Sequence, residues 1–305
     1  MGGPSHTQTY TEAVRRFEIQ DDGQALMVNK LADWQDAGLF HRRDFNVIPQ
    51  ITPGGEQAIM AFAGVFQPTV DLPFLNIIHI DSSGYTEVPG FQQHYQQYHC
   101  AHLPLYSAST QSMHNIFFGG MSQFYDSAGV RVEDTQVPFV PTIACVSIDN
   151  QGVPHEWLLP LQMPDLLGSS AEFIPLEGLQ TYANGVIRMD QLQGDTILLG
   201  HIFGGIHSSA PNIFWINDGT QSTATSELFE VYLLLNQGIG LQESAESQSF
   251  RAWFNSKDEL IVEWLSSKEA LVQFWLADLN GRELYRSEAK SMADEPLSTV
   301  QLNLG

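Results

Sequence analysis

The chain has 305 residues, of which 43% are hydrophobic and 16% are charged, and its formal net charge is −22. A chain of this length can form two domains with ample cores, and its composition fits a β-rich globular protein rather than a disordered one. A surface this negative repels nucleic acids and anionic membranes, so neither is an expected partner. No run reaches the roughly 18 to 20 apolar residues that span a bilayer, and residues 1–6 do not resemble a signal peptide.

Strand-sized runs separated by Gly, Asn and Asp turns fill residues 9–235, which is the pattern of antiparallel hairpins. Residues 9–19 and 24–29 are expected to be the outer two strands of a partial unit. Three units of four strands follow. Their expected strands are 43–49, 61–64, 76–81 and 85–88 in the first, 98–104, 117–120, 142–149 and 155–159 in the second, and 169–175, 202–205, 212–217 and 227–234 in the third.

Each of the three units repeats the same short pattern. Its first strand ends in an Ile-Pro or Leu-Pro step, and its second strand ends in a small residue followed by a glycine, at Gly64, Gly120 and Gly205. Self-similarity at this scale indicates a repeat architecture, and four strands per repeat are typical of a β-propeller. The glycines are expected where the chain turns too tightly for a side chain to fit.

The strand ends at residues 117–120 (FFGG) and 202–205 (IFGG), with 62–64 (FAG) as a degenerate copy, resemble the kelch repeat of galactose-oxidase-like propellers. This resemblance implies that residues 1–235 form a partial β-propeller of about three and a half four-stranded blades. Because a propeller typically needs four to eight blades to close its ring, we expect the chain to be incomplete at its N-terminus.

The remaining residues read as a linker and a second, smaller domain. Residues 236–249 are polar and contain several Gly and Ser, which is typical of a linker. Residues 250–305 are predicted to form a small Ig-like antiparallel β-sandwich, with strands at 259–264, 270–278, 283–285 and 298–302.

Three parts of this second domain resemble the C-terminal sorting domain of type IX secretion in Bacteroidetes: the strand at 260–263, the turn at 277–282 (ADLNGR) and the closing residues 300–305 (VQLNLG). The resemblance implies a secreted or outer-cell-surface protein that engages the secretion machinery. The family's Pro-Asn-Pro opening is absent and the chain stops at Gly305, so this domain is expected to be incomplete. The alternative is an ordinary Ig-like appendage.

Matched polar residues stand on the first strands of the three units, which line the central channel of a propeller. Aligned on their prolines, the columns are Arg43, Tyr98 and Ser169; Asp44, His99 and Ser170; and Asn46, Ala101 and Glu172. We predict a ligand-binding site near the axis, formed by His41, Arg42, Arg43, Asp44, Tyr98, His99 and Glu172. The two guanidinium groups would suit a carboxylate or sulfate group on a sugar. The alternative is that these side chains bond only to one another and to channel water.

Metal and cofactor sites are not expected. Four histidines, at positions 94, 99, 102 and 114, are close in sequence, but His99 and His102 fall on opposite sides of a strand. There is no Gly-rich phosphate cradle, nucleophile elbow or zinc-binding HExxH motif. Cys100 and Cys145 belong to strands that are not adjacent, about 9 to 10 Å apart, so both are expected to be free and buried.

These patterns favour non-catalytic recognition of a glycan or a surface protein. One alternative is a sugar-processing enzyme such as a sialic acid mutarotase, an activity that some kelch propellers support. His99 and Glu172 would then be its acid and base. Another alternative is a structural surface module whose propeller is a rigid spacer. The fold alone does not choose among these functions.

Overall fold

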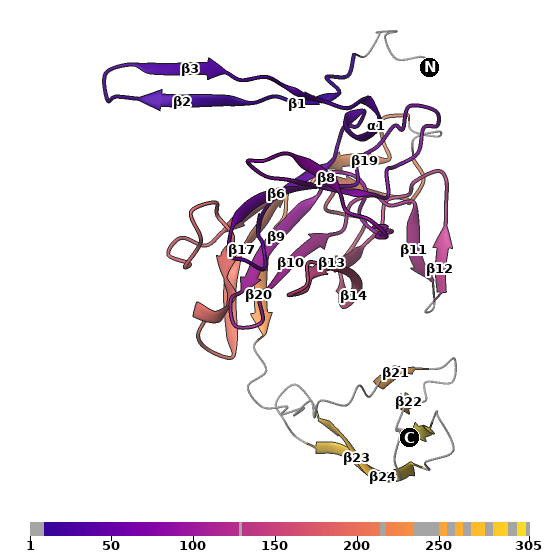
Figure 1. Cartoon of the computed structure of the whole chain (residues 1–305). Helices are drawn as coiled ribbons and strands as arrows, with labels where there is room; N and C mark the ends of the chain where they lie inside the picture. The colour runs from indigo at the N-terminus through magenta and orange to yellow at the C-terminus, as the bar shows by residue number, and fades with distance from the viewer. Residues whose placement is uncertain are drawn as a thin grey trace. The chain divides into compact units, whose positions relative to one another are not determined.

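The computed structural model describes residues 9–127, 130–213 and 218–234 in full, and the backbone of five strands between residues 250 and 302. The regular secondary structure of the described chain is almost entirely β-strand, arranged in several separate and open sheets (Figure 1), which confirms the all-β prediction. The chain divides into two units, residues 1–236 and 237–305. Within the described residues, no helix has the length and apolar character needed to cross a membrane.

The first sheet has four antiparallel strands in sequence order, as the repeat pattern predicts. They are β5 (Asn46–Ile51), β6 (Gln57–Phe62), β7 (Ile77–Ile80) and β8 (Tyr85–Glu87). Buried residues alternate with more exposed ones along residues 46–50 of β5 and 57–60 of β6, so these parts of the strands present one face to the core. A short turn at Thr52–Gly55, in which the amide of Gly55 donates to the carbonyl of Thr52, joins β5 to β6.

The second sheet contains the four expected strands and one more. The order is β14 (Pro154–Gln162), β13 (Thr142–Ile148), β10 (Ser112–Phe118), β9 (Ala101–Ser107) and β16 (Ile187–Arg188), and β16 runs parallel to β9. A hairpin of β11 (Phe124–Ser127) and β12 (Val130–Glu133) separates β10 from β13. Cys100 and Cys145 are both free and buried, as predicted.

The third sheet differs from the prediction. It consists of β15 (Ala171–Pro175), β17 (Thr196–Gly204) and β20 (Leu228–Leu234), and β20 pairs directly with β17, so the strand expected at 212–217 does not lie between them. Residues 214–217 are outside the described residues. The preceding residues pack elsewhere: Ile213 is buried beside Met121 and Phe139, and the Asn212 amide donates to Asp134 at 2.9 Å. This attachment to the second sheet's loops competes with strand pairing.

Two smaller hairpin segments and two short helices complete the first unit. Strand β18 (Ile206–Ser208) pairs with β19 (Ser222–Ala224), and a single 3₁₀ turn, η1 (Met189–Gln191), follows β16. At the start, β1 (Ala13–Val14) pairs with β4 (Trp34–Gln35), and the helix α1 (Ala37–Phe40) follows.

The N-terminal strands also differ from the prediction. Residues 9–19 do not form one strand; instead β2 (Phe17–Asp21) and β3 (Leu26–Lys30) make a separate two-stranded hairpin that projects from the sheets (Figure 1). The Asp22 carboxylate accepts the amides of Gln24 and Ala25, which fixes the turn. This turn chemistry is local to the hairpin.

The three sheets pack face to face, with a hydrophobic core on each side of the second sheet. One core joins the first and second sheets, where Phe62 and Phe117 meet edge to face with ring centroids 5.2 Å apart. The other core joins the second and third sheets and includes Leu103, Leu105 and Ile202. Within the described part of this unit, the second sheet is therefore covered on both faces, whereas the first and third sheets each pack against the second sheet alone.

The repeated glycines occupy equivalent places in the three sheets. Gly64, Gly120 and Gly205 have φ of 94°, 99° and 85°. A Cβ on each would come within about 3 Å of a residue at the start of β5, β9 or β15, or one position before it: 2.8 Å from Phe45 Cβ, 3.0 Å from Cys100 Cβ and 2.9 Å from Ala171 Cβ. A side chain at any of these three glycines would therefore be too close to its neighbours, as the sequence predicts.

The second unit contains two antiparallel sheets. One has β21 (Phe250–Phe254), β22 (Leu260–Trp264) and β25 (Ser298–Leu302), and the other has β23 (Ala270–Ala277) and β24 (Glu283–Ser291). Strand β21 was not predicted. The expected linker at 236–249, the turn at 278–282 and residues 303–305 lie outside the described residues.

Candidate functional site

The beginnings of the inner strands β5, β9 and β15 lie next to one another, although they belong to three different sheets. The amide of His99 donates to the carbonyl of Asp44 at 2.7 Å, and the amide of Ser170 donates to the carbonyl of His99 at 2.9 Å. These are the three residues that the repeat alignment placed in one column. Asp44 and Ser170 both have positive φ, 51° and 57°, a strained conformation for residues other than glycine. Three sheets therefore bring equivalent positions to one place.

Asn46 fixes the geometry between the first two inner strands. Its side chain is fully buried, its Oδ1 accepts the amide of Cys100 at 3.0 Å, and its Nδ2 donates to the carbonyl of Tyr98 at 3.3 Å. A buried side-chain amide that bonds to backbone on both of its ends holds that backbone firmly. Asn46 is thus a positioning residue for His99, which lies between its two partners.

His99 and Glu172 are brought together from the second and third sheets. The His99 Nε2 lies 3.3 Å from the Glu172 Oε1, and both side chains are accessible, at 31% and 63% exposed. The sequence predicted this pair as the acid and base of an enzyme. An imidazole next to a carboxylate can accept and donate protons and can bond to hydroxyl groups.

Arg43, Asp44 and Tyr98 extend the same surface. The Arg43 Nε lies 3.4 Å from the Asp44 Oδ2, and its guanidinium stacks 4.2 Å from the ring centre of Phe66. Burial, followed by the negative charge of Asp44, raises the pKa of Tyr98 to about 12, so its hydroxyl stays protonated and able to donate. We call Arg43, Asp44, Tyr98, His99 and Glu172 the inner-edge cluster.

Arg42 lies apart from this open surface. It is only 5% exposed, and its guanidinium donates to the carbonyl groups of Leu39 and Ala63 and to the Asn76 side chain, while it stacks on Phe74. Burial lowers its pKa to about 10, which leaves it charged at neutral pH. Its donors are directed into the fold, so we do not include Arg42 in the inner-edge cluster.

His41 packs against the N-terminal segment, which sequence reasoning did not connect with the site. Its ring stacks on Tyr10 with centroids 3.9 Å apart, and its Nδ1 bonds to the Glu12 carboxylate. Tyr10 and Glu12 precede the repeats, so no repeat alignment could have indicated them. His102 also adjoins the cluster, and burial lowers its pKa, which favours its neutral form.

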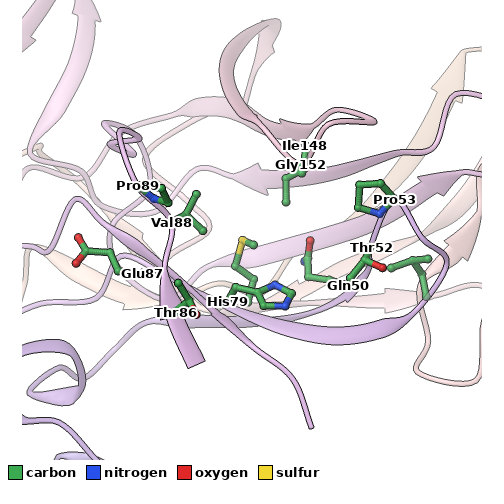
Figure 2. Close-up of a pocket in the computed structure, with 12 residues that line it drawn as sticks. Gln50, Thr52, Pro53, His79, Thr86, Glu87, Val88, Pro89, Ile148 and Gly152 are labelled. Carbon is green, nitrogen blue, oxygen red and sulfur yellow. The ribbon is translucent and has the colours of Figure 1, made fainter. Parts of the chain in front are cut away.

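A cavity of about 300 Å³ lies elsewhere, between the first sheet and the turn that joins β13 to β14 (Figure 2). Its apolar lining residues include Ile51, Met60, Val88 and Ile148. Its polar groups already have partners within the fold: the buried Gln50 amide bonds to Asn115, the Glu87 carboxylate to Asn76, and His79 to Asp81. The cavity shares no residue with the inner-edge cluster and offers little free polar chemistry.

Among the residues that the structure describes, no group of three or more His, Cys, Asp and Glu side chains is placed to hold a metal ion. Comparison with protein-family models, with curated proteins and with solved structures finds no match for this chain. The candidate site therefore rests on its geometry alone.

Proposed function

We propose that this chain is a secreted or cell-surface recognition protein that binds a carbohydrate, without catalysis, at the inner-edge cluster. In this proposal residues 1–235 are an arc of kelch-like propeller blades. The face-to-face packing of three sheets and the equivalent positions of Gly64, Gly120 and Gly205 support it. Radial repetition of small sheets is the plan of a propeller.

The observation that carries the proposal is the chain of backbone bonds from Asp44 to His99 to Ser170. It joins the residues that lie one or two positions before β5, β9 and β15, and it leaves the side chains of His99 and Glu172 open to solvent. Loops and strand ends that meet on a rigid β-scaffold are the usual place for a binding site.

A neutral sugar fits this cluster better than the sulfated or carboxylated sugar that a pair of arginines would bind. Arg42 is buried, and Arg43 lies beside Asp44, so no pair of free guanidinium groups faces solvent here. The carboxylates of Asp44 and Glu172, on a chain of net charge −22, repel anions. The same carboxylates accept hydrogen bonds from sugar hydroxyls, and Tyr98 can donate one.

In this proposal residues 250–305 form a separate domain, which the predicted linker at 236–249 joins to the first unit. Two antiparallel sheets in this domain are compatible with an Ig-like sandwich. Its turn and closing strand resemble those of a type IX sorting domain, and we propose that it directs export to the cell surface.

A second candidate function is a mutarotase-like sugar-processing enzyme. The contact of 3.3 Å between His99 and Glu172 favours it, because opening a sugar ring needs an acid and a base close together. Observation of anomeric exchange by NMR separates the two functions. If the native protein speeds anomeric exchange above the rate without protein and the double variant H99A/E172A does not, the enzyme function is supported. Equal exchange rates with both proteins would contradict it.

Replacement of His99 by alanine is expected to weaken binding of neutral glycans by about tenfold or more, because a hydrogen bond to an ionisable group is lost. Native protein and H99A are compared on an array of neutral, sulfated and sialylated glycans. The matched control is H155A, since His155 also lies 3.2 Å from a carboxylate, that of Asp149, but on the outermost strand of the second sheet. If the native protein prefers sulfated or sialylated glycans, or if H155A weakens glycan binding as much as H99A does, the proposal is contradicted.

A further inference from the structure

The cavity of about 300 Å³ beside the first sheet lies where the core between the first and second sheets ends. One row of paired residues crosses the four strands of this sheet on the side that faces the core: Ile48, Met60, His79 and Thr86. Ile48 and Met60 are buried, whereas the His79 side chain is 28% exposed and Thr86 is exposed. The row therefore leads from the core into the cavity and ends in two polar side chains at its mouth.

Two turns with fixed geometry line this cavity. In the turn between β13 and β14, which contributes Gly152, the Asp149 carboxylate accepts the amide of Val153 at 2.9 Å. In the turn between β5 and β6, the hydroxyl of Thr52 accepts the amide of Glu56 at 3.1 Å. Because each turn is held by its own hydrogen bonds, the cavity is largely formed without a ligand, as small-molecule sites usually are.

The lining favours an uncharged and mainly apolar ligand. Glu87 is the only carboxylate among the described residues that line the cavity, and its side chain points away from the others (Figure 2). It accepts a hydrogen bond from the Asn76 amide at 3.0 Å, and the Asn76 carbonyl accepts one from Arg42 at 2.9 Å. Glu87 is thus engaged with the buried Arg42, and an amine in the cavity would lack a carboxylate partner.

His79 and Thr86 can recognise one hydroxyl group. The His79 Nε2 lies 3.3 Å from the Asp81 carboxylate, and hydrogen bonds from the hydroxyl and amide of Ser83 lower the pKa of Asp81 to about 2. Asp81 is therefore ionised and repels anions. A neutral imidazole that donates through Nε2 has Nδ1 as an acceptor, and the Thr86 hydroxyl can donate or accept.

We propose that this cavity is a second binding site, which takes a small uncharged ring compound with one hydroxyl group, such as a phenol or a naphthol. The ring packs against Met60, Val88 and Ile148, and its hydroxyl donates to the Nδ1 of His79. A volume of about 300 Å³ is at the small end of ligand sites, so an oligosaccharide does not fit. The site shares no residue with the inner-edge cluster and does not depend on the proposed function.

The first test measures binding of 2-naphthol to the full chain by isothermal titration calorimetry. The native protein is expected to bind one 2-naphthol per chain, and to bind 2-naphthoate and 2-naphthylmethylamine about tenfold more weakly or less, because a charge is costly in an apolar cavity. T86W places an indole at the mouth and is expected to weaken 2-naphthol binding by about tenfold or more.

T196W is the matched control, because Thr196 is an exposed strand residue of the third sheet, on the other side of the second sheet. It is expected to bind 2-naphthol as the native protein does. Absence of binding by the native protein, tighter binding of either charged probe, or equal binding by T86W and the native protein would overturn the proposal.

The second test examines His79 with two probes that differ in the hydroxyl hydrogen, 2-naphthol and 2-methoxynaphthalene. The native protein is expected to prefer 2-naphthol by about threefold to tenfold, the worth of one hydrogen bond. H79F keeps a ring at this position and is expected to bind both probes equally. A preference that H79F retains, or its absence in the native protein, would overturn the role of His79. Neither probe is a sugar, and glycan binding by T86W should be unchanged, so failure of this site and failure of the inner-edge cluster are recognised separately.

Discussion

The variant G205A is expected to lower the free energy of unfolding by about 3 kcal/mol, whereas G204A, one residue earlier, should lower it by only about 1 kcal/mol. Both glycines have positive φ, 85° and 74°, so both variants incur the strain of a side chain in the left-handed region. Only Gly205 also has neighbours in the way: a Cβ there would lie 2.6 Å from the Ser169 carbonyl oxygen. Nothing lies within 4 Å of a Cβ at Gly204.

Urea unfolding of the native protein and both variants measures this difference. The adjacent pair isolates the steric overlap from the backbone strain, because the two residues share the same strand end. The overlap involves Ser169 and Ala171, the residues that place the inner-edge cluster's third strand, so G205A should also weaken glycan binding. Equal losses of stability in G204A and G205A would contradict the close approach that we infer for the repeat.

The variant R42A is expected to lower the free energy of unfolding by about 3 kcal/mol, because it leaves buried carbonyl groups without a donor. The Arg42 guanidinium joins α1, the end of β6 and the start of β7 through Leu39, Ala63 and Asn76.

Thermal and urea unfolding of R42A, with R131A as the control, measure this effect. Arg131 is exposed on the β11–β12 hairpin, 5.8 Å above the ring of Phe124, and its replacement should change stability by less than about 1 kcal/mol. If R42A were as stable as R131A, the buried bonding of Arg42 described here would be wrong, and Arg42 would return to the candidate ligand-binding residues.

The repeat in the sequence predicted the parts of the fold that every unit shares. The turn residues and the strand-sized runs between them predicted the four strands of the first sheet. The equivalent glycines predicted where the second strand of each unit comes close to the first. The same alignment placed Asp44, His99 and Ser170 in one column, because equivalent residues of packed repeats occupy equivalent positions in space.

Features that belong to one unit alone could not be predicted in this way. The short strand β16, which runs parallel to β9, has no counterpart in the first and third sheets as described, and its pairing depends on tertiary contacts rather than local pattern. The missing strand of the third sheet is a similar case, since Ile213 is held by the core beside Met121. The buried position of Arg42 depends on its bond to Asn76, which lies 34 residues away in sequence. The sequence pattern therefore predicted Arg42 as a ligand-binding residue, although its guanidinium is buried.

The most direct test of the central claim is a titration of one glycan, the best neutral binder on the array, against three conservative variants: D44N, H99Q and E172Q. Each variant alters one sheet only and keeps the side chain's size, and Asn tolerates the positive φ of Asp44. If the three sheets build one site, all three variants should bind more weakly, by about threefold to thirtyfold each. Weaker binding in only one variant, or unchanged binding in all three, would contradict a shared site.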